Sequence, residues 1–315
     1  MKRQFTYIVT EEDAKEKRSI NQLARKNFTF SSRLRQKIKK GNLITVNDTL
    51  IPVWQVPSPG DVITVSLPEE TSYFEPEDIP INVIYEDDDL LIINKQAGIT
   101  VHPTNGQPHH TLANGVAQYL LDTHQVFKIR FINRLDMDTS GLIAVGKNSH
   151  AQGEFVKESK KGLVVKEYTA LVDGIVCRDA GIIDAPIGRH PTEPLCRGVV
   201  EDGKPSVTHY RVLQRFTDNT AASKALAPTG LTLVQLRLET GRTHQIRVHM
   251  SHIGHTVTGD WLYKSPNRHL INRQVLHASR LAFAHPVTGR LLDLKAPLPE
   301  DMQQLLQQFQ ATTPL

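Results

Sequence analysis

The spacing of apolar and polar residues predicts several β-strands along the chain. Residues 231–239 (LTLVQLRLE) alternate most cleanly between the two kinds, and residues 166–172 (KEYTALV) show the same character. A period of two is typical of a strand that has one face on a hydrophobic core. Short apolar runs between turn residues predict the remaining strands. These lie at 43–46, 61–65, 142–145 and 275–283, with a hairpin at 83–94.

Apolar residues three or four positions apart predict helices between the strands. In the segment 243–253, Ile246, Met250 and Ile253 fall on one stripe of a helix. The other helices are expected at 20–26, 32–40, 111–121, 150–160 and 301–310. Because strands and helices are mixed and do not follow a strict β-α-β order, the chain predicts an α+β fold with a mixed, largely antiparallel sheet flanked by helices.

An acidic, proline-rich segment divides the chain into two parts. Residues 68–80 (PEETSYFEPEDIP) lack apolar periodicity, which is typical of a linker. We therefore expect a small N-terminal α+β domain at residues 1–70, a linker at 71–80 and a larger domain at 81–315. The polar residues 217–230 are expected to form a mobile loop between two strands.

The composition is that of a globular enzyme. The chain has 315 residues, of which 39% are hydrophobic and 22% charged, enough to bury a sizeable core. Its apolar runs are too short to span a membrane, and its first residues lack the apolar centre of a secretory signal. The two cysteines, Cys177 and Cys196, do not have the spacing of zinc ligands. We therefore expect neither structural zinc nor a disulfide framework, and a cytoplasmic location.

The net charge of +4 is unevenly distributed. Between Lys15 and Lys40 the chain carries ten basic residues and one acidic residue, Glu16. Such a cluster attracts polyanions, and nucleic acid is a better partner than a membrane because no aromatic belt accompanies the charge. A solvated helix face is the alternative interpretation. The candidate RNA contacts in this stretch are Arg33, Arg35, Lys37, Lys39 and Lys40.

The segment 131–148 (FINRLDMDTSGLIAVGKN) carries the strongest chemical signal. Asp136 follows Arg134 by two residues, and a buried strand is expected directly afterwards. If the segment is extended, Arg134 and Asp136 share one face and Leu135 points the other way. A carboxylate beside a cation stays ionised, which suits a nucleophile or a base. A hairpin with a solvated ion pair is the alternative.

A second candidate segment spans residues 239–263. Here Arg242, Thr243 and His244 are expected in the first turn of a helix, where free N–H groups favour an anion, and Arg247 lies one turn further. Such a helix would bind a phosphate or an active-site carboxylate. An ordinary amphipathic helix with basic surface residues is the alternative.

The sequence gives no sign of a metal or a nucleotide cofactor. Four histidines lie in the second candidate segment, but no carboxylate or third ligand shares the face of His249 and His252. The chain has no phosphate-binding loop of the Walker type, no GxGxxG motif and no GxSxG motif. We therefore predict no metal and no cofactor.

Taken in order, these segments resemble the RluA-type RNA pseudouridine synthase family. Residues 133–142 (NRLDMDTSGL) resemble its HRLDxxTSGL motif, residues 166–172 its KxYxAxV strand, and residues 241–249 (GRTHQIRVH) its GRxHQIRxH helix. The segments 101–116 and 276–299 are also similar to motifs of this family. The first 70 residues resemble the alpha-L RNA-binding domain of ribosomal proteins, through SSRLRQKIKKGNLITVND and PGDVITV.

This resemblance implies an isomerase with the pseudouridine synthase fold and no cofactor. Asp136 would be the nucleophile or base, Arg247 would pair with it, and Tyr168 would stack on the base and help to deprotonate the rotated ring. Arg134 would help to extrude the uridine from an RNA helix. Arg242 and His244 would be further RNA contacts. The expected partner is structured ribosomal or transfer RNA, bound by a monomer without a membrane or a protein partner.

Several points stay open at the level of the sequence. Asn133 stands where the family usually has histidine, and we expect a changed hydrogen bond without loss of activity. A non-catalytic RNA-binding protein is one alternative function. A glycoside-type hydrolase is another, although it needs two carboxylates and only Asp136 has a convincing setting. The RNA, the uridine, and the choice between attack on the sugar and removal of a sugar proton are not specified.

Overall fold

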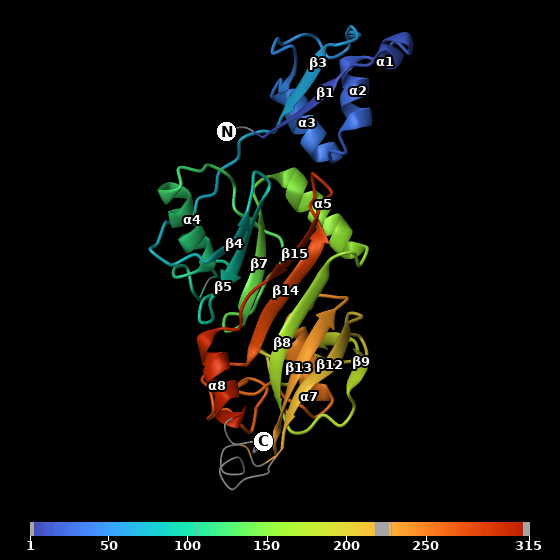
Figure 1. Ribbon diagram of the computed structural model, residues 1–315. Coiled ribbons are helices and arrows are strands. Elements are labelled where there is room, and N and C mark those ends of the chain that lie inside the picture. Colours follow the sequence, from blue (N-terminus) through green and yellow to red (C-terminus); the bar gives the residue numbers. More distant parts are fainter. Residues whose placement is uncertain (1–2, 105, 218–226, 228, 311–315) are drawn as a thin grey trace.

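The computed structural model describes residues 3–104, 106–217, 227 and 229–310, which form two packed units (Figure 1). The loop predicted at 217–230 lies mostly outside these residues. No helix in the described part of the chain is long and apolar enough to cross a membrane.

The N-terminal unit is a three-stranded antiparallel sheet with three helices. Its strand order is β1-β3-β2, and the residues of its hydrophobic core, from Val9 to Leu67, come from this unit alone. Ser31 accepts a hydrogen bond from the backbone N–H of Leu34 as N-cap, and Gly41 ends the same helix, as predicted. The sequence did not predict the first strand and helix. The elements are β1 (Gln4–Ile8), α1 (Glu11–Lys15), α2 (Ile20–Asn27), α3 (Ser32–Lys40), β2 (Ile44–Val46) and β3 (Val62–Ser66).

The larger unit is built on a ten-stranded sheet with the order β4-β5-β7-β14-β8-β13-β12-β9, to which β6 adds beside β7 and β15 beside β14. The pair β7–β14 is parallel and the other strand pairs of this sheet are antiparallel in the described part of the chain, so the prediction of a mixed, largely antiparallel sheet is confirmed. The strands of this sheet are β4 (Val83–Glu86), β5 (Leu90–Lys95), β6 (Arg130–Phe131), β7 (Ser140–Gly146), β8 (Val165–Asp173), β9 (Ala180–Asp184), β12 (Val207–Phe216), β13 (Leu231–Leu238), β14 (Leu276–Ala284) and β15 (Leu291–Lys295).

Helices cover both faces of this sheet. Leu91 and Ile93 of β5 share a core with α4 and α7, whereas Leu90 and Ile92 of the same strand share a core with α5. This burial on both sides explains why β5 is a continuous apolar run with no alternation. The helices are α4 (Leu112–Asp122), α5 (Ser149–Lys160), α7 (Gln245–His252) and α8 (Glu300–Gln310), and a two-stranded ribbon is formed by β10 (Ile187–Arg189) and β11 (Arg197–Val199).

The two units are joined by an ion pair and by aromatic contacts. Arg3 donates through Nε and Nη2 to the two carboxylate oxygens of Asp89, at 3.0 and 2.8 Å, and the Asp89 side chain is only 2% exposed. The ring of His150 in α5 meets Phe5 and Phe30 edge-on, with centroids 5.5 and 5.0 Å apart. The N-terminal unit is therefore fastened to the end of the sheet near β4 and α5 (Figure 1).

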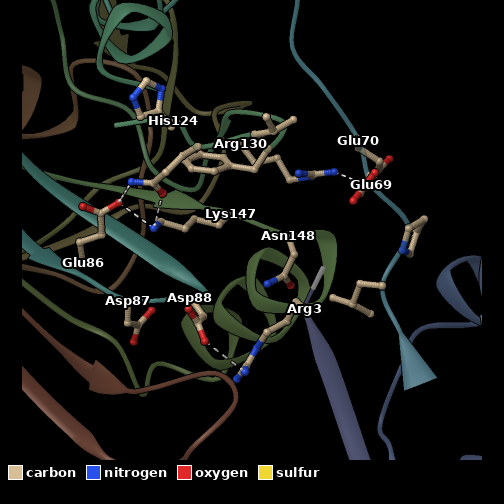
Figure 2. Close-up of a pocket in the computed structure, with 15 residues that line it drawn as sticks. Arg3, Glu69, Glu70, Glu86, Asp87, Asp88, His124, Arg130, Lys147 and Asn148 are labelled. Atoms are coloured by element: carbon tan, nitrogen blue, oxygen red, sulfur yellow. Dashed lines mark hydrogen bonds and ion pairs between the residues drawn. The ribbon is translucent and has the colours of Figure 1, made fainter. Parts of the chain in front are cut away.

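A third contact between the units runs through Glu70. Its carboxylate accepts hydrogen bonds from Lys37 of α3, at 2.8 Å, and from Arg130 of β6. Figure 2 shows Glu70 and Arg130, together with Arg3, around a pocket of about 400 Å³ between the units. None of the candidate catalytic residues lines this pocket.

The segment between the units has no helix or strand, as expected for a linker, but it lies against the larger unit. Ser72 accepts a hydrogen bond from the backbone N–H of Ile129 at 2.7 Å, and the carbonyl of Glu75 accepts one from Asn114 at 2.8 Å. These contacts fix the path of the connection.

Loss of Arg3 should weaken the junction measurably. We expect Arg3→Met to lower the free energy of unfolding by about 2 kcal/mol, because the buried carboxylate of Asp89 would lose its cation. Adding Asp89→Asn should restore part of the loss. Urea unfolding measures both. Lys157→Met, which breaks the exposed pair with Glu154, serves as the control and should change stability by less than about 0.5 kcal/mol. Equal effects of Arg3→Met and the control would contradict the role of this pair.

Candidate active site

Asp136 lies in a loop of turns directly before β7 and not on a strand. The burial nevertheless alternates as expected, because Leu135 is buried while Arg134 is exposed and Asp136 is half-buried, although all three residues line the same cavity. Asp136 does not pair with Arg134. The guanidinium of Arg134 donates to the hydroxyl of Thr243 at 3.1 Å, so the pairing of Arg134 with Asp136 that both interpretations of the sequence assumed is wrong.

The loop of Asp136 is held by a buried lysine that the sequence analysis missed. Lys95, at the end of β5, is fully buried, and its three ammonium protons match three carbonyl acceptors. Burial lowers the pKa of Lys95 to about 7, and the charges of Asp138 and Asp136 act against this shift. The carbonyl oxygens belong to Gln96, Ile99 and Met137, at 2.8, 2.9 and 2.8 Å. One of them belongs to the residue that follows Asp136, so Lys95 fixes the backbone of the loop.

The residues after Asp136 attach the loop to β14. Gly141 has a φ of +111°, and a Cβ at this position would lie 2.3 Å from the carbonyl oxygen of Ala278. Only glycine allows this close approach of β7 and β14. Next to it, the hydroxyl of Ser140 lies 2.9 Å from Nδ1 of His277. The short TSGL run therefore serves the parallel pairing of β7 with β14, and Asp136 lies just before β7, an interior strand of the sheet.

Asn133, which departs from the family motif, acts as a substitute for strand pairing. Its side-chain Oδ1 accepts the backbone N–H of Ala144 at 2.7 Å, and its Nδ2 donates to the carbonyl of Leu142 at 3.3 Å. The side chain thus binds β7 and not the carboxylate of Asp136.

Arg247 meets Asp136 inside the molecule. Its Nη1 donates to Oδ2 of Asp136 at 3.0 Å, and the side chains are 5% and 27% exposed, respectively. The guanidinium also donates through Nε and Nη2 to Asp260, at 2.6 and 2.9 Å. Burial alone would lower the pKa of Arg247, but the hydrogen bonds and charges of Asp260 and Asp136 raise it above its ordinary value. Because Arg247 is buried, the alternative of an ordinary surface helix is wrong.

The start of α7 differs from the prediction. The helix begins at Gln245, so Arg242, Thr243 and His244 lie before it and not in its first turn. His244 has a φ of +57°, and the side chain of Gln245 accepts the backbone N–H of Arg242 at 3.0 Å. These three residues therefore form a bend before α7, and their side chains line the cavities beside Asp136.

Two further side chains complete the wall around Arg247. The ring of Tyr263 lies 5.1 Å from the guanidinium carbon of Arg247, and its hydroxyl lies 3.1 Å from Nδ1 of His244. Nε2 of His244 is 3.9 Å from Oδ2 of Asp136. Burial lowers the pKa of His244, against the opposing charge of Asp136, so the imidazole is neutral at physiological pH.

A cavity of about 590 Å³ lies in front of these groups, and a recess of about 60 Å³ extends from it. Asp136, Tyr168, Arg134 and Arg242 line both. A volume of this size is within the range of small-molecule sites. Burial, followed by the charge of Asp136, raises the pKa of Tyr168, so its hydroxyl is protonated.

A neighbouring cavity of about 570 Å³ shares Arg134, Gly241, Arg242 and Thr243 with the first. Its lining includes five basic residues and one acidic residue, Asp202. The basic residues are Arg134, Arg189, Arg197, Lys204 and Arg242. The sequence analysis missed Arg189, Arg197 and Lys204 because they are scattered around the β10–β11 ribbon and form no local charge cluster.

The five basic candidates of the N-terminal unit lie on α3, whereas the cavity beside Asp136 belongs to the larger unit. Leu34 and Ile38 of α3 face the core, so the charged side chains of this helix lie on its other faces. Arg35 and Lys39 line a groove of about 420 Å³ between α2 and α3. Lys37 is paired with Glu70 and is committed to the junction.

The histidines of the second segment do not form a metal site. Both ring nitrogens of His249 have partners, the hydroxyl of Thr208 at 2.8 Å and the carbonyl of Ala185 at 2.9 Å.

Among the residues that the structure describes, Asp87, Asp89 and His285 also lie close enough to suggest metal ligands. Nδ1 of His285 accepts backbone N–H groups of Val287 and Thr288, so Nε2 carries the proton and is no ligand. Asp89 is already bound by Arg3. The group does not fit a metal.

The chain is similar to known RNA pseudouridine synthases. A family model described as RNA pseudouridylate synthase matches residues 89–252. An uncharacterized RNA pseudouridine synthase of Bacillus subtilis, YlyB, is 39% identical over 95% of the chain and 96% of its own length. Ribosomal large subunit pseudouridine synthase D of Vibrio cholerae is 37% identical over 97% of the chain and 95% of its own length. The structure of human RNA pseudouridylate synthase domain containing 1 aligns with a TM-score of 0.57 and 26% identity, covering 77% of this chain and 98% of its own.

Proposed function

Because the chain belongs to the RNA pseudouridine synthase family, we propose that it converts uridine to pseudouridine in ribosomal RNA with Asp136 as its catalytic carboxylate. The protein is thus an isomerase that acts on RNA. The observation that carries the assignment of Asp136 is its ion pair with Arg247 in the wall of the recess that extends from the cavity. The ribosomal substrate is supported by the name of the Vibrio cholerae relative, and transfer RNA is the alternative substrate.

The reaction needs few chemical groups. The bond from the ribose to the ring nitrogen of uracil breaks, the base turns, and a ring carbon forms the new bond, without net oxidation or reduction. Arg247 holds Oδ2 of Asp136, and no hydrogen bond to Oδ1 occurs among the described residues. We assign Oδ1 to the reacting sugar, either as nucleophile or as base.

Tyr168 has the position of a stacking residue. Its ring lines both the cavity and the recess beside Asp136. The raised pKa argues against the expectation that its hydroxyl deprotonates the rotated ring, because a base would have to be a phenolate. We therefore assign the Tyr168 ring to holding the detached uracil.

The basic residues around the cavities suit an RNA strand. Arg134 and Arg242 lie where the two larger cavities meet, so a nucleotide turned out of the strand would enter past them. Neutral His244 is available as a hydrogen-bond partner. Beyond them, Arg189, Arg197 and Lys204 would bind the phosphates that flank the target.

We also propose that the enzyme acts as a monomer in the cytoplasm. The residues assigned to catalysis come from one chain, and both cysteines are free thiols, as in a reducing compartment. The residues 1–70, 71–80 and 81–315 are proposed as RNA-binding domain, linker and catalytic domain.

Asp136→Asn tests the catalytic assignment. We expect pseudouridine formation to fall by at least about 1,000-fold, or ~4 kcal/mol, while RNA affinity changes less than about threefold, because the amide keeps the shape but loses the charge. Mapping of pseudouridine in ribosomal RNA incubated with each variant measures this. Asp138→Asn, in the same loop, is the matched control. Full activity of Asp136→Asn would reject the assignment, and release of free uracil by the native protein would favour a hydrolase.

The basic face of α3 should contribute salt-dependent affinity. Combined replacement of Arg33, Lys39 and Lys40 by glutamine removes three exposed charges and should reduce the slope of log Kd against log salt by about 2 to 3. Turnover at saturating RNA should not change. Replacement of Lys157, Lys160 and Lys161 of α5 by glutamine is the control with equal charge loss. An unchanged slope in the α3 variant would contradict a role in RNA binding.

Asn133→His tests the departure from the family motif. Because the Asn133 side chain binds β7 and not Asp136, we expect turnover to stay within about tenfold of the native value, or ~1.4 kcal/mol. Pseudouridine formation under single-turnover conditions gives the rate. A loss of several hundredfold would mean that Asn133 has a direct role in catalysis.

A further inference from the structure

Asp260 is a fully buried charged group next to the proposed active site. Its side chain is 0% exposed, and its Oδ2 accepts the Nε–H of Arg247 at 2.6 Å. Its Oδ1 accepts three hydrogen bonds, from Nη2 of Arg247 at 2.9 Å and from the backbone N–H groups of Leu262 and Tyr263 at 3.1 Å each. Both carboxylate oxygens of Asp260 thus already accept hydrogen bonds from the protein, and neither reaches the cavity.

The turn that carries Asp260 is itself rigid. Gly259 has a φ of +79°, and a Cβ there would lie 2.1 Å from the carbonyl oxygen of Arg273. The hydroxyl of Ser265 accepts the backbone N–H of Gly259 at 3.1 Å and donates to buried Asp173 at 2.6 Å. Asp260 is therefore anchored by the fold independently of Arg247.

This arrangement limits how Arg247 meets Asp136. A free guanidinium tends to bind a carboxylate with two parallel hydrogen bonds, which would engage both oxygens. Asp260 already occupies the Nε and Nη2 edge, so only Nη1 is directed at Asp136. The positive charge of Arg247 is also shared between two carboxylates.

We propose that Asp260 is a positioning residue, which holds Arg247 so that a single N–H reaches Asp136 and the second oxygen of Asp136 stays free to react. The inference rests on the proposed role of Asp136. Asp260 acts through Arg247 and touches neither the cavity nor the substrate.

Asp260→Asn provides the test, because the amide keeps the volume and removes the charge. We expect turnover at saturating RNA to fall about 100-fold and the KM for RNA to change less than about threefold. This split between turnover and KM separates lost positioning of Asp136 from weaker RNA binding. Asp260→Glu, which restores the charge, should recover part of the turnover.

A double-mutant cycle separates this role from a loss of stability. In an Arg247→Lys background the two parallel hydrogen bonds from Arg247 to Asp260 are absent. Asp260→Asn should therefore cause little further loss of turnover. Asp293→Asn is the matched control, because Arg280 binds Asp293 through the same two nitrogens, at 2.7 and 3.0 Å, outside the active site. It should leave turnover and the KM for RNA unchanged.

The outcomes distinguish the two proposals. If Asp260→Asn behaves like Asp293→Asn, or if its loss multiplies fully with that of Arg247→Lys, the positioning role is wrong. If Asp136→Asn retains activity, the catalytic assignment itself fails, whatever Asp260 does.

Discussion

A buried guanidinium is the constraint on which the site depends. Arg247 is removed from water, and an unpaired charge there would cost several kcal/mol. Its two carboxylate partners come from different parts of the chain, Asp136 from the loop before β7 and Asp260 from the turn after α7. The fold must bring three elements together to satisfy one side chain. The same contacts that stabilise Arg247 therefore set the geometry of the carboxylate that is proposed to react.

The backbone around Asp136 is likewise held by buried basic side chains that need hydrogen-bond partners. Lys95 and Arg273 are both buried, and each donates to a carbonyl group of the loop that carries Asp136, Lys95 to Met137 and Arg273 to Asp138. A loop without helix or strand has no internal pattern of backbone hydrogen bonds, so side chains must supply the partners. The loop can then be irregular enough to present Asp136 to the cavity and still be rigid.

Local patterns in the sequence predicted the helices and strands whose formation depends on the spacing of nearby residues. Alternation identified β8 and β13, and the motif at 133–142 located Asp136. The pattern did not predict Lys95, which lies at the end of an apolar strand, or Asp260, which lies in a turn. Their roles depend on partners far away in the chain, such as Met137, which is 42 residues from Lys95. The start of α7 was misplaced because the left-handed backbone of His244 leaves no signal in apolar spacing.

The junction between the units fixes the positions of two basic regions relative to each other. Basic residues are concentrated at two places, on α3 and around the cavities beside Asp136, and the contacts of Arg3, His150 and Glu70 hold the two units in one orientation. Burial lowers the pKa of His150, so its ring stays neutral between Phe5 and Phe30. Contacts to phosphates carry little sequence information, but two such regions at a fixed separation discriminate among RNA shapes. If both regions bind RNA as proposed, the selection of one uridine depends on whether an RNA can reach α3 while it places that nucleotide in the cavity.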